Sequence, residues 1–137
     1  MTNYESCVIF LLAKAYQKAH GYFKRRLQTY GLTPIQHLIL ECLWDEEGLA
    51  VREIGSRLVL DGATLSGVLD RMSDAAWVVK KTDPEDKRIT RINLGRRARK
   101  LKPRLMKERK AANKAILVEL SLEEKILLKR LLRDVRG

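Results

Sequence analysis

Lysine and arginine side chains supply most of the chemistry that this sequence offers. Of its 137 residues, 28 are Lys or Arg and 17 are Asp or Glu, which gives a formal net charge of +11 at pH 7 and a pI near 10. A folded chain this basic is expected to bind polyanions, and nucleic acid is the first candidate. A basic module that binds only other proteins is the alternative.

The stretch Asp61–Met72 combines small and hydroxyl-bearing residues with an apolar face. Leu65, Val68, Leu69 and Met72 recur at the spacing that buries one side of a helix. The opposite face is small, so the helix could approach another surface closely, and its hydroxyls could contact base edges or phosphates. The candidate DNA contacts on this helix are Gly62, Ala63, Thr64, Ser66 and Gly67, with Arg71 for a phosphate.

A second short helix must position this one. Residues 51–58 have helical spacing, and the segment 58–61 is so short that the two helices must turn sharply against each other. This arrangement predicts a helix-turn-helix in which Asp61 caps the second helix. Arg52 and Arg57 of the first helix are expected to be free to reach phosphates.

Two strand-like stretches follow the helix-turn-helix. Residues 77–81 lead into Asp83-Pro84-Glu85-Asp86-Lys87-Arg88, and residues 90–94 then alternate between polar and apolar side chains. Pro84 and the flanking acids indicate a turn, so the pattern predicts a hairpin, or wing, with a charged tip. Thr90, Ile92 and Leu94 should point inward, and we expect these two strands to form the only sheet.

These motifs together resemble the MarR family of bacterial winged-helix transcriptional regulators. The resemblance rests on Leu32-Thr33-Pro34-Ile35-Gln36, the helix-turn-helix and the wing, and it extends over nearly the whole chain. It implies a mainly α fold with a small β-hairpin wing, in one domain spanning residues 1–137. Residues 32–94 would form the DNA-binding lobe, and residues 1–30 and 95–137 would form the dimerisation helices.

The resemblance also implies roles for the charged residues of the wing. Arg88 would lie at the tip and reach the minor groove, where an arginine senses the narrow groove of A·T-rich DNA. Asp86 would orient Arg88 through a salt bridge, and Asp70 is expected to be an internal salt-bridge partner or a solvated acid. Further phosphate candidates are Lys80, Lys81, Lys87 and Arg91.

The ends of the chain read as long helices. One is predicted from about Tyr4 to Tyr30, and its segment Val8–Leu12 is apolar nearly all round, which indicates contact with other helices or a second subunit. Another is predicted from Gly95 to Leu120, with Pro103 either kinking it or standing in its first turn. The family resemblance assigns the first and last helices to a homodimer.

Capping motifs mark two further helix starts. Thr33 and Gln36 form a predicted capping box with Pro34 at the first helical position. Ser121 and Glu124 form another, which should begin the final helix.

The function expected from these features is sequence-specific transcriptional regulation. The chain would act as a repressor that binds double-stranded DNA at a pseudo-palindromic operator, as a homodimer with half-sites about 10 bp apart, and a small-molecule signal would release it. A non-specific architectural DNA-binding protein is the alternative.

The resemblance implies a small aromatic or phenolic effector between the dimer helices and the DNA-binding lobe. Residues with an apolar body and a polar tip could line such a cleft. These candidates are Tyr16, His20, Tyr30, His37 and Trp44, each of which could instead be a core or interface residue.

The two cysteines do not form a disulfide framework. Cys42 reads as a buried core thiol. The organic-hydroperoxide sensors of the same family use a cysteine near the start of their first helix, and Cys7 lies close to that place but about two residues early relative to Thr33. A thiol-based peroxide-sensing repressor acting through Cys7 is therefore a further alternative function.

Several classes of protein are excluded by what the sequence lacks. Its 2 histidines have no evident partner, and neither a metal-ligand spacing nor a glycine-rich phosphate loop occurs, so no enzyme, metal or cofactor is expected. No apolar stretch is long enough for a membrane span, and the N-terminus lacks a signal-peptide pattern, so a cytoplasmic protein is expected.

The sequence departs from the family pattern at three local positions. Ala50 replaces the usual threonine cap of the first helix-turn-helix helix, and a lost cap costs roughly 1 kcal/mol. Ala76 replaces a glycine, where a positive φ would be awkward for alanine. Gly95 replaces the threonine that commonly follows Leu94.

Overall fold

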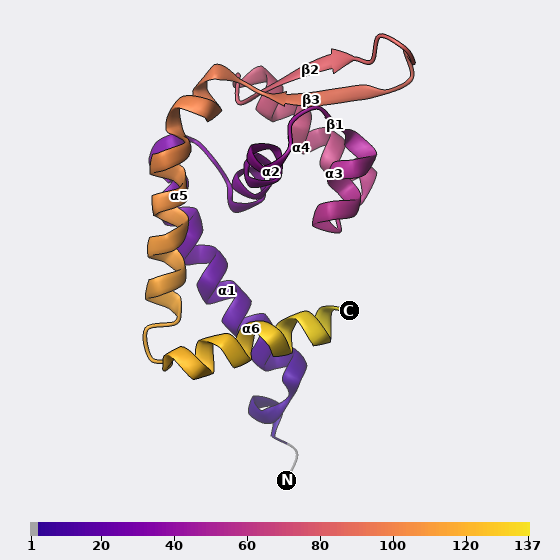
Figure 1. The fold of residues 1–137 in the computed structure, drawn as a ribbon. Helices are drawn as coiled ribbons and strands as arrows, with labels where there is room; N and C mark the ends of the chain where they lie inside the picture. The colour runs from indigo at the N-terminus through magenta and orange to yellow at the C-terminus, as the bar shows by residue number, and fades with distance from the viewer. Residues whose placement is uncertain (1–2) are drawn as a thin grey trace. The chain divides into compact units, whose positions relative to one another are not determined.

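The computed structural model describes residues 3–137 and is mainly helical, with one small sheet (Figure 1), as the sequence predicts. The described elements are, in chain order, η1 (Tyr4–Ser6), α1 (Val8–Leu27), η2 (Gln28–Tyr30), α2 (Pro34–Asp45), β1 (Leu49–Ala50), α3 (Val51–Leu58), α4 (Gly62–Asp74), β2 (Val78–Thr82), β3 (Thr90–Leu94), α5 (Arg96–Ile116) and α6 (Leu122–Arg136). Within these described residues, no helix is both long and apolar enough to cross a membrane.

The chain divides into two compact units. One, the central unit, is Leu27–Met106, and the other, the terminal unit, combines the described part of Met1–Arg26 with Lys107–Gly137. The central unit therefore contains α2, α3, α4, the sheet and the first half of α5.

The central unit has its own apolar core. Leu40 of α2, Ile54 of α3 and Leu65 of α4 are fully buried together with Trp77 and Ile92. Burial of one such side chain contributes roughly 1.5–3 kcal/mol. On α4 the predicted inward residues Leu65, Val68, Leu69 and Met72 are all buried, so the apolar spacing correctly identified which face of this helix packs inward.

The sheet has three antiparallel strands in the order β1-β3-β2. Val78 pairs with Leu94 across β2 and β3, and Leu49 pairs with Ile92 across β1 and β3. The prediction that two strands form the only sheet is wrong, because two residues are too few to show an alternating pattern. The inward positions of Ile92 and Leu94 are confirmed, while Thr90 is half-buried.

The predicted first helix, Tyr4 to Tyr30, is wrong at both ends. Cys7 is extended, with φ −70° and ψ 124°, and separates η1 from α1. A 3₁₀ turn then carries the chain to Gly31, whose φ of 71° suits a glycine.

The helix starts of α2 and α6 are formed as predicted. In α2 the backbone N–H of Gln36 donates to Thr33 Oγ1 at 3.3 Å, and the Thr33 N–H donates to Gln36 Oε1 at 3.0 Å. Ser121 and Glu124 repeat this capping box at α6. Pro103 lies inside α5, which runs from Arg96 to Ile116, so the idea that a helix starts at Pro103 is wrong.

One alanine and one valine adopt the left-handed backbone conformation. Ala76 has φ 63°, as the family comparison predicted, and Val59, in the turn between α3 and α4, has φ 55°. This conformation costs roughly 1–2 kcal/mol for a residue with a Cβ. The surrounding contacts must therefore offset that cost at both turns.

Gly95 occupies a position that has no room for a side chain. Its N–H donates to the Trp77 carbonyl at 2.8 Å, and an added Cβ would lie 2.3 Å from the Ala76 carbonyl oxygen. The end of β3 thus approaches the turn after α4 so closely that a glycine is needed, which explains this departure from the family pattern.

Candidate nucleic-acid interface

The first turn of α4 is exposed and capped. The carboxylate of Asp61 accepts the Thr64 N–H at 2.8 Å and the Thr64 hydroxyl at 2.8 Å. The hydrogen bond from the Thr64 backbone is the main reason that the pKa of Asp61 lies below its ordinary value. Thr64 still presents its hydroxyl oxygen as an acceptor, because only its proton is used by the cap.

The predicted contact residues of α4 lie on its outer face. Gly62, Ala63, Thr64 and Ser66 are exposed and Gly67 is half-buried, while Arg71 is exposed one turn further on. Their small size leaves the backbone of the first two turns open to a surface that a bulky side chain would keep away.

The two arginines of α3 differ in their surroundings. Arg52 is exposed. Arg57 instead forms ion pairs with Glu46 at 2.7 Å and with Asp45 at 3.6 Å, and the hydrogen bond to Glu46 raises its pKa. The expectation that Arg57 is free is therefore wrong, because the acidic end of α2 folds beside it.

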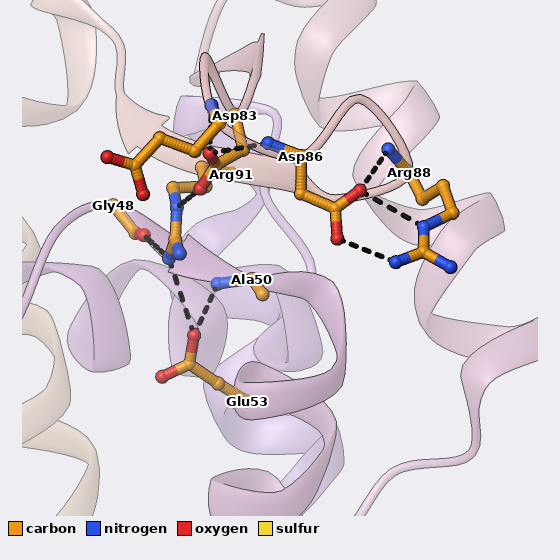
Figure 2. A network of polar contacts seen from close by, with 8 residues as sticks. Gly48, Ala50, Glu53, Asp83, Asp86, Arg88 and Arg91 are labelled. Atoms are coloured by element: carbon orange, nitrogen blue, oxygen red, sulfur yellow. Dashed lines mark hydrogen bonds and ion pairs between the residues drawn. The ribbon is translucent and has the colours of Figure 1, made fainter.

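Arg88 projects from the wing beside Asp86. Its side chain is 90% exposed, and its Nε and Nη2 donate to the two carboxylate oxygens of Asp86 at 3.1 Å each (Figure 2). These side-chain bonds are the main cause of the lowered pKa of Asp86 and the raised pKa of Arg88. The predicted salt bridge is confirmed, and because an exposed pair stabilises little, its main effect is to orient the guanidinium.

Arg91 lies at the base of the wing and contacts three other segments (Figure 2). Its Nε donates to Asp83 Oδ2 at 2.6 Å, and its Nη1 donates to the Gly48 carbonyl at 3.0 Å and lies 3.6 Å from Glu53 Oε1. The bond from Arg91 is the main cause of the lowered pKa of Asp83. Arg91 was predicted to be a phosphate contact, but the donors named here are directed to acceptors within the protein.

The lysines of the wing differ in whether they form an ion pair. Lys80 pairs with Asp70, which confirms Asp70 as a salt-bridge partner. Lys81 and Lys87 are exposed. These two remain candidates for contact with a polyanion.

A groove of about 690 Å³ brings the predicted residues of three elements together. It lies between the start of α3, the outer face of α4 and the wing. Its lining includes Arg52, Ser66 and Arg88 as well as Ala50, Val51, Glu53, Asp86, Ile89 and Thr90. The helix-turn-helix and the wing therefore present their candidate contacts around one concave surface.

Of the five candidate effector residues, two lie in the terminal unit and three lie in the central unit. The rings of Tyr16 and His20 lie 5.4 Å apart in the terminal unit. In the central unit His37 is fully buried between Glu41 and the Leu105 carbonyl, each at 3.0 Å from a ring nitrogen. The proposal that His37 lines an open cleft is therefore contradicted by its burial.

Trp44 and Tyr30 also contact α5 within the central unit. The Trp44 indole N–H donates to the Ala98 carbonyl at 3.3 Å, and the Tyr30 carbonyl accepts a hydrogen bond from Arg97 at 3.2 Å. These contacts favour the alternative interpretation of Trp44 as a packing residue.

The burial of Cys42 agrees with the prediction, whereas Cys7 lies just before α1 and not inside the predicted first helix. Cys7 is exposed and Cys42 is buried, and burial raises the pKa of the Cys42 thiol. Across residues 3–137, no group of three potential metal ligands comes together.

No contact was predicted for Glu53 or for Asp83 at the base of the wing. Glu53 accepts the Ala50 N–H at 3.0 Å as well as facing Arg91, and Asp83 accepts the N–H groups of Glu85 and Asp86. The spacing of Glu53 three residues after Ala50, which is that of a capping box, was the available signal for Glu53.

The MarR family profile matches residues 32–90 of this chain. The regulator MgrA of Staphylococcus aureus is 30% identical over 104 residues, which are 75% of this chain and 71% of MgrA. The chain belongs to the MarR family. The family resemblance that the motifs indicated is thereby confirmed.

Two further MarR-type proteins define how far the similarity extends. The regulator TtmR of Methylorubrum extorquens is 40% identical over 93 residues, 66% of this chain but 48% of TtmR, so the chain matches about half the length of that relative. The structure of PcaV from Streptomyces coelicolor with its natural ligand has a TM-score of 0.87 at 26% identity and covers 99% of this chain and 96% of PcaV. The winged-helix fold is thus shared over nearly the whole described chain.

Proposed function

We propose that this protein regulates transcription by binding duplex DNA with α4 in the major groove and the wing in the minor groove. The observation that carries the proposal is the concave surface on which Arg52, Ser66 and Arg88 meet. An α-helix fits the major groove, and helix-turn-helix proteins contact base edges through the first residues of the second helix. The exposed first turn of α4 suits that role.

The side chains favour readout of DNA shape over extensive base contacts. Residues 62–67 of α4 offer only Thr64 and Ser66 as polar groups, so bidentate recognition of guanine from these turns is absent. Arg88 supplies the complementary readout, because a guanidinium in a narrow A·T-rich minor groove meets an enhanced negative potential. The phosphate contacts are assigned to Arg52, Arg71, Lys81 and Lys87, and the net charge of +11 supports them.

The terminal unit supports a homodimer. Val8 is 63% exposed and Ile9 79% on α1, and Leu122 is 68% and Ile126 62% on α6. Ala112 is the one buried hydrophobic residue among the described residues of this unit, so its apolar faces lack a core of their own. A second copy would cover them, because exposed apolar surface of this extent marks an interaction site.

Pairing also determines how the DNA is read. Two lobes related by a two-fold axis would contact half-sites about 10 bp apart on one side of the duplex. Occupation of such an operator by the dimer would exclude RNA polymerase, which makes repression the expected outcome.

The dimer is tested by an Ile9→Arg substitution. A charge in the apolar interface should convert the protein to a monomer in sedimentation equilibrium at micromolar concentration. Val59→Arg, which places the same charge on the 72% exposed side chain of the helix-turn-helix, is the matched control and should remain dimeric. A wild-type monomer would refute the proposed assembly.

Selection of bound sites from a random duplex pool tests the DNA-binding proposal. We expect a motif with two-fold symmetry and a half-site spacing of about 10 bp. Enrichment of no motif would instead support a non-specific architectural DNA-binding protein. Failure to bind duplexes even at low salt would support a basic module that binds only other proteins.

A small aromatic or phenolic molecule is the proposed releasing signal, since PcaV is known with its natural ligand bound. Tyr16, His20 and Tyr30 are the remaining candidate contacts. Hydroxybenzoates should raise the dissociation constant of the selected duplex measured by fluorescence anisotropy. Unchanged binding with the whole panel would count against a phenolic effector.

Peroxide sensing through Cys7 is the second candidate signal, and it is favoured by the exposure of this thiol. Organic hydroperoxide should then release DNA from the wild type and not from Cys7→Ser. Equal release from both proteins would remove Cys7 from the mechanism.

A further inference from the structure

Arg91 connects the wing to the helix-turn-helix through contacts between distant parts of the chain. It occupies the central strand β3, where it pairs with Ala50 of β1 on one side and Lys81 of β2 on the other. Its guanidinium contacts the carboxylate of Asp83, just beyond β2, and the carbonyl of Gly48, just before β1. It also lies beside Glu53 in the first turn of α3.

The geometry of a guanidinium makes this connection directional. Arginine presents its donors in a rigid plane, so contacts from Nε and Nη1 to different segments fix the angle between those segments. Glu53 is itself held, because its Oε1 accepts the Ala50 N–H at 3.0 Å. The base of the wing is therefore attached to the start of α3 at a defined orientation.

Asp83 extends the same contacts toward the wing tip. Its Oδ2 accepts from Arg91, while its Oδ1 accepts the backbone N–H groups of Glu85 at 2.7 Å and Asp86 at 3.1 Å. Asp86 in turn holds the guanidinium of Arg88. An unbroken series of polar contacts thus runs from Glu53 through Arg91 and Asp83 to Arg88 (Figure 2).

We propose that Arg91 is a positioning residue for DNA recognition, and that the clasp formed by Glu53, Arg91 and Asp83 sets where Arg88 enters the minor groove. This inference rests on the proposed function, because it requires that Arg88 contacts DNA. It differs from a phosphate-binding role, since one arginine between two carboxylates gives the clasp a net charge of −1 rather than a surplus of positive charge.

A double-mutant cycle with Arg88 tests how Arg91 acts. We expect Arg91→Ala to weaken binding of the selected duplex about tenfold in the wild-type background and less than about twofold in the Arg88→Ala background, because residues that act through one another are not additive. Equal losses in both backgrounds would overturn the proposal. Arg71→Ala, which removes an independent phosphate contact, is the matched control and should add fully to Arg88→Ala.

Arg91→Lys separates positioning from simple charge. Lysine retains the positive charge but lacks the planar fork, so the clasp should be lost and the affinity should fall nearly as far as in Arg91→Ala. Full retention of affinity by Arg91→Lys would indicate a phosphate contact and overturn the proposal. Asp83→Asn provides the second variant if Arg91→Ala does not fold, and it should show the same non-additivity with Arg88→Ala.

The proposed function and the inference fail in different ways. No effect of Arg88→Ala on binding would refute the placement of Arg88 in the groove and, with it, the role of the clasp. A large effect of Arg88→Ala combined with additive loss from Arg91→Ala would refute the clasp alone.

Discussion

The tip and the base of the wing contain two arginines with opposite surroundings. Arg88 at the tip is 90% exposed and pairs only with Asp86, two residues away, among the contacts described. Arg91 at the base is 39% exposed and reaches the Gly48 carbonyl, 43 residues away. A local pair leaves a guanidinium facing outward for a ligand, whereas long-range contacts use its donors to hold segments together.

The largest predicted effect is a loss of folding stability caused by a substitution at the base of the wing. Gly95→Ala places a Cβ 2.3 Å from the Ala76 carbonyl, so it should lower the free energy of unfolding by about 3 kcal/mol, as overpacking does. Urea denaturation at a fixed protein concentration measures this. Gly67→Ala, whose Cβ would meet only a flexible Arg71 side chain at 3.8 Å, should instead gain roughly 0.5–1 kcal/mol. Equal stability of the two variants would contradict the close approach at Gly95.

The tip should show the reverse behaviour, with a loss of DNA binding and no loss of stability. Arg88→Ala should weaken binding of the selected duplex by roughly ten- to a hundredfold, the range expected for one good base or groove contact. The urea midpoint should remain unchanged, because the side chain is almost fully exposed. An unaltered dissociation constant, measured by fluorescence anisotropy, would show that the tip does not take part in recognition.

A smaller effect is expected where α4 meets the wing. Ala76 has φ 63°, so Ala76→Gly should raise the free energy of unfolding by about 1 kcal/mol through relief of the left-handed strain, with DNA affinity unchanged. Ala75, with φ −86°, provides the matched position, and Ala75→Gly should lower stability by roughly 0.5–1 kcal/mol. A loss of stability in Ala76→Gly would mean that the turn is not strained.

The smallest predicted effect is the pH dependence of the stabilisation by the two wing carboxylates, which is absent near neutral pH. The pKa of Asp83 and that of Asp86 are lowered in the folded protein by Arg91 and Arg88. The stabilisation is therefore complete above the unfolded pKa of about 3.9 and disappears as the pH falls through the folded values. The side-chain carboxyl carbon shifts of Asp83 and Asp86, followed by NMR, should stay constant from about pH 7 to pH 5 and should change with midpoints below the ordinary value of about 3.9. A transition centred above about pH 5 would contradict this assignment.

The sequence predicted the parts of the site whose contacts are local. The Asp61 cap and the apolar face of α4 each depend on residues within a few positions of one another, so spacing was sufficient for them. The local pair of Asp86 and Arg88 was implied by the family resemblance of the wing. The internal contacts of Arg57 and Arg91 were not predicted, because their partners, Glu46 and Gly48, are brought near only by folding.

The same reason explains the other differences between prediction and structure. His37 was a cleft candidate by residue type, but the Leu105 carbonyl that holds it lies 68 residues away. The strand β1 was missed because it exists only through pairing with β3. Long-range pairing therefore gives several of the candidate contact residues structural partners that the sequence alone did not reveal.

Hydroxyl-radical footprinting of the selected duplex tests the central claim most directly, because the radical cleaves the sugar backbone from the minor groove. The wild type should protect one minor-groove segment on each side of the symmetric motif, and Arg88→Ala should lose these two protections while the major-groove contacts of α4 persist in methylation protection. Identical hydroxyl-radical footprints for the two proteins would contradict the placement of the wing in the minor groove.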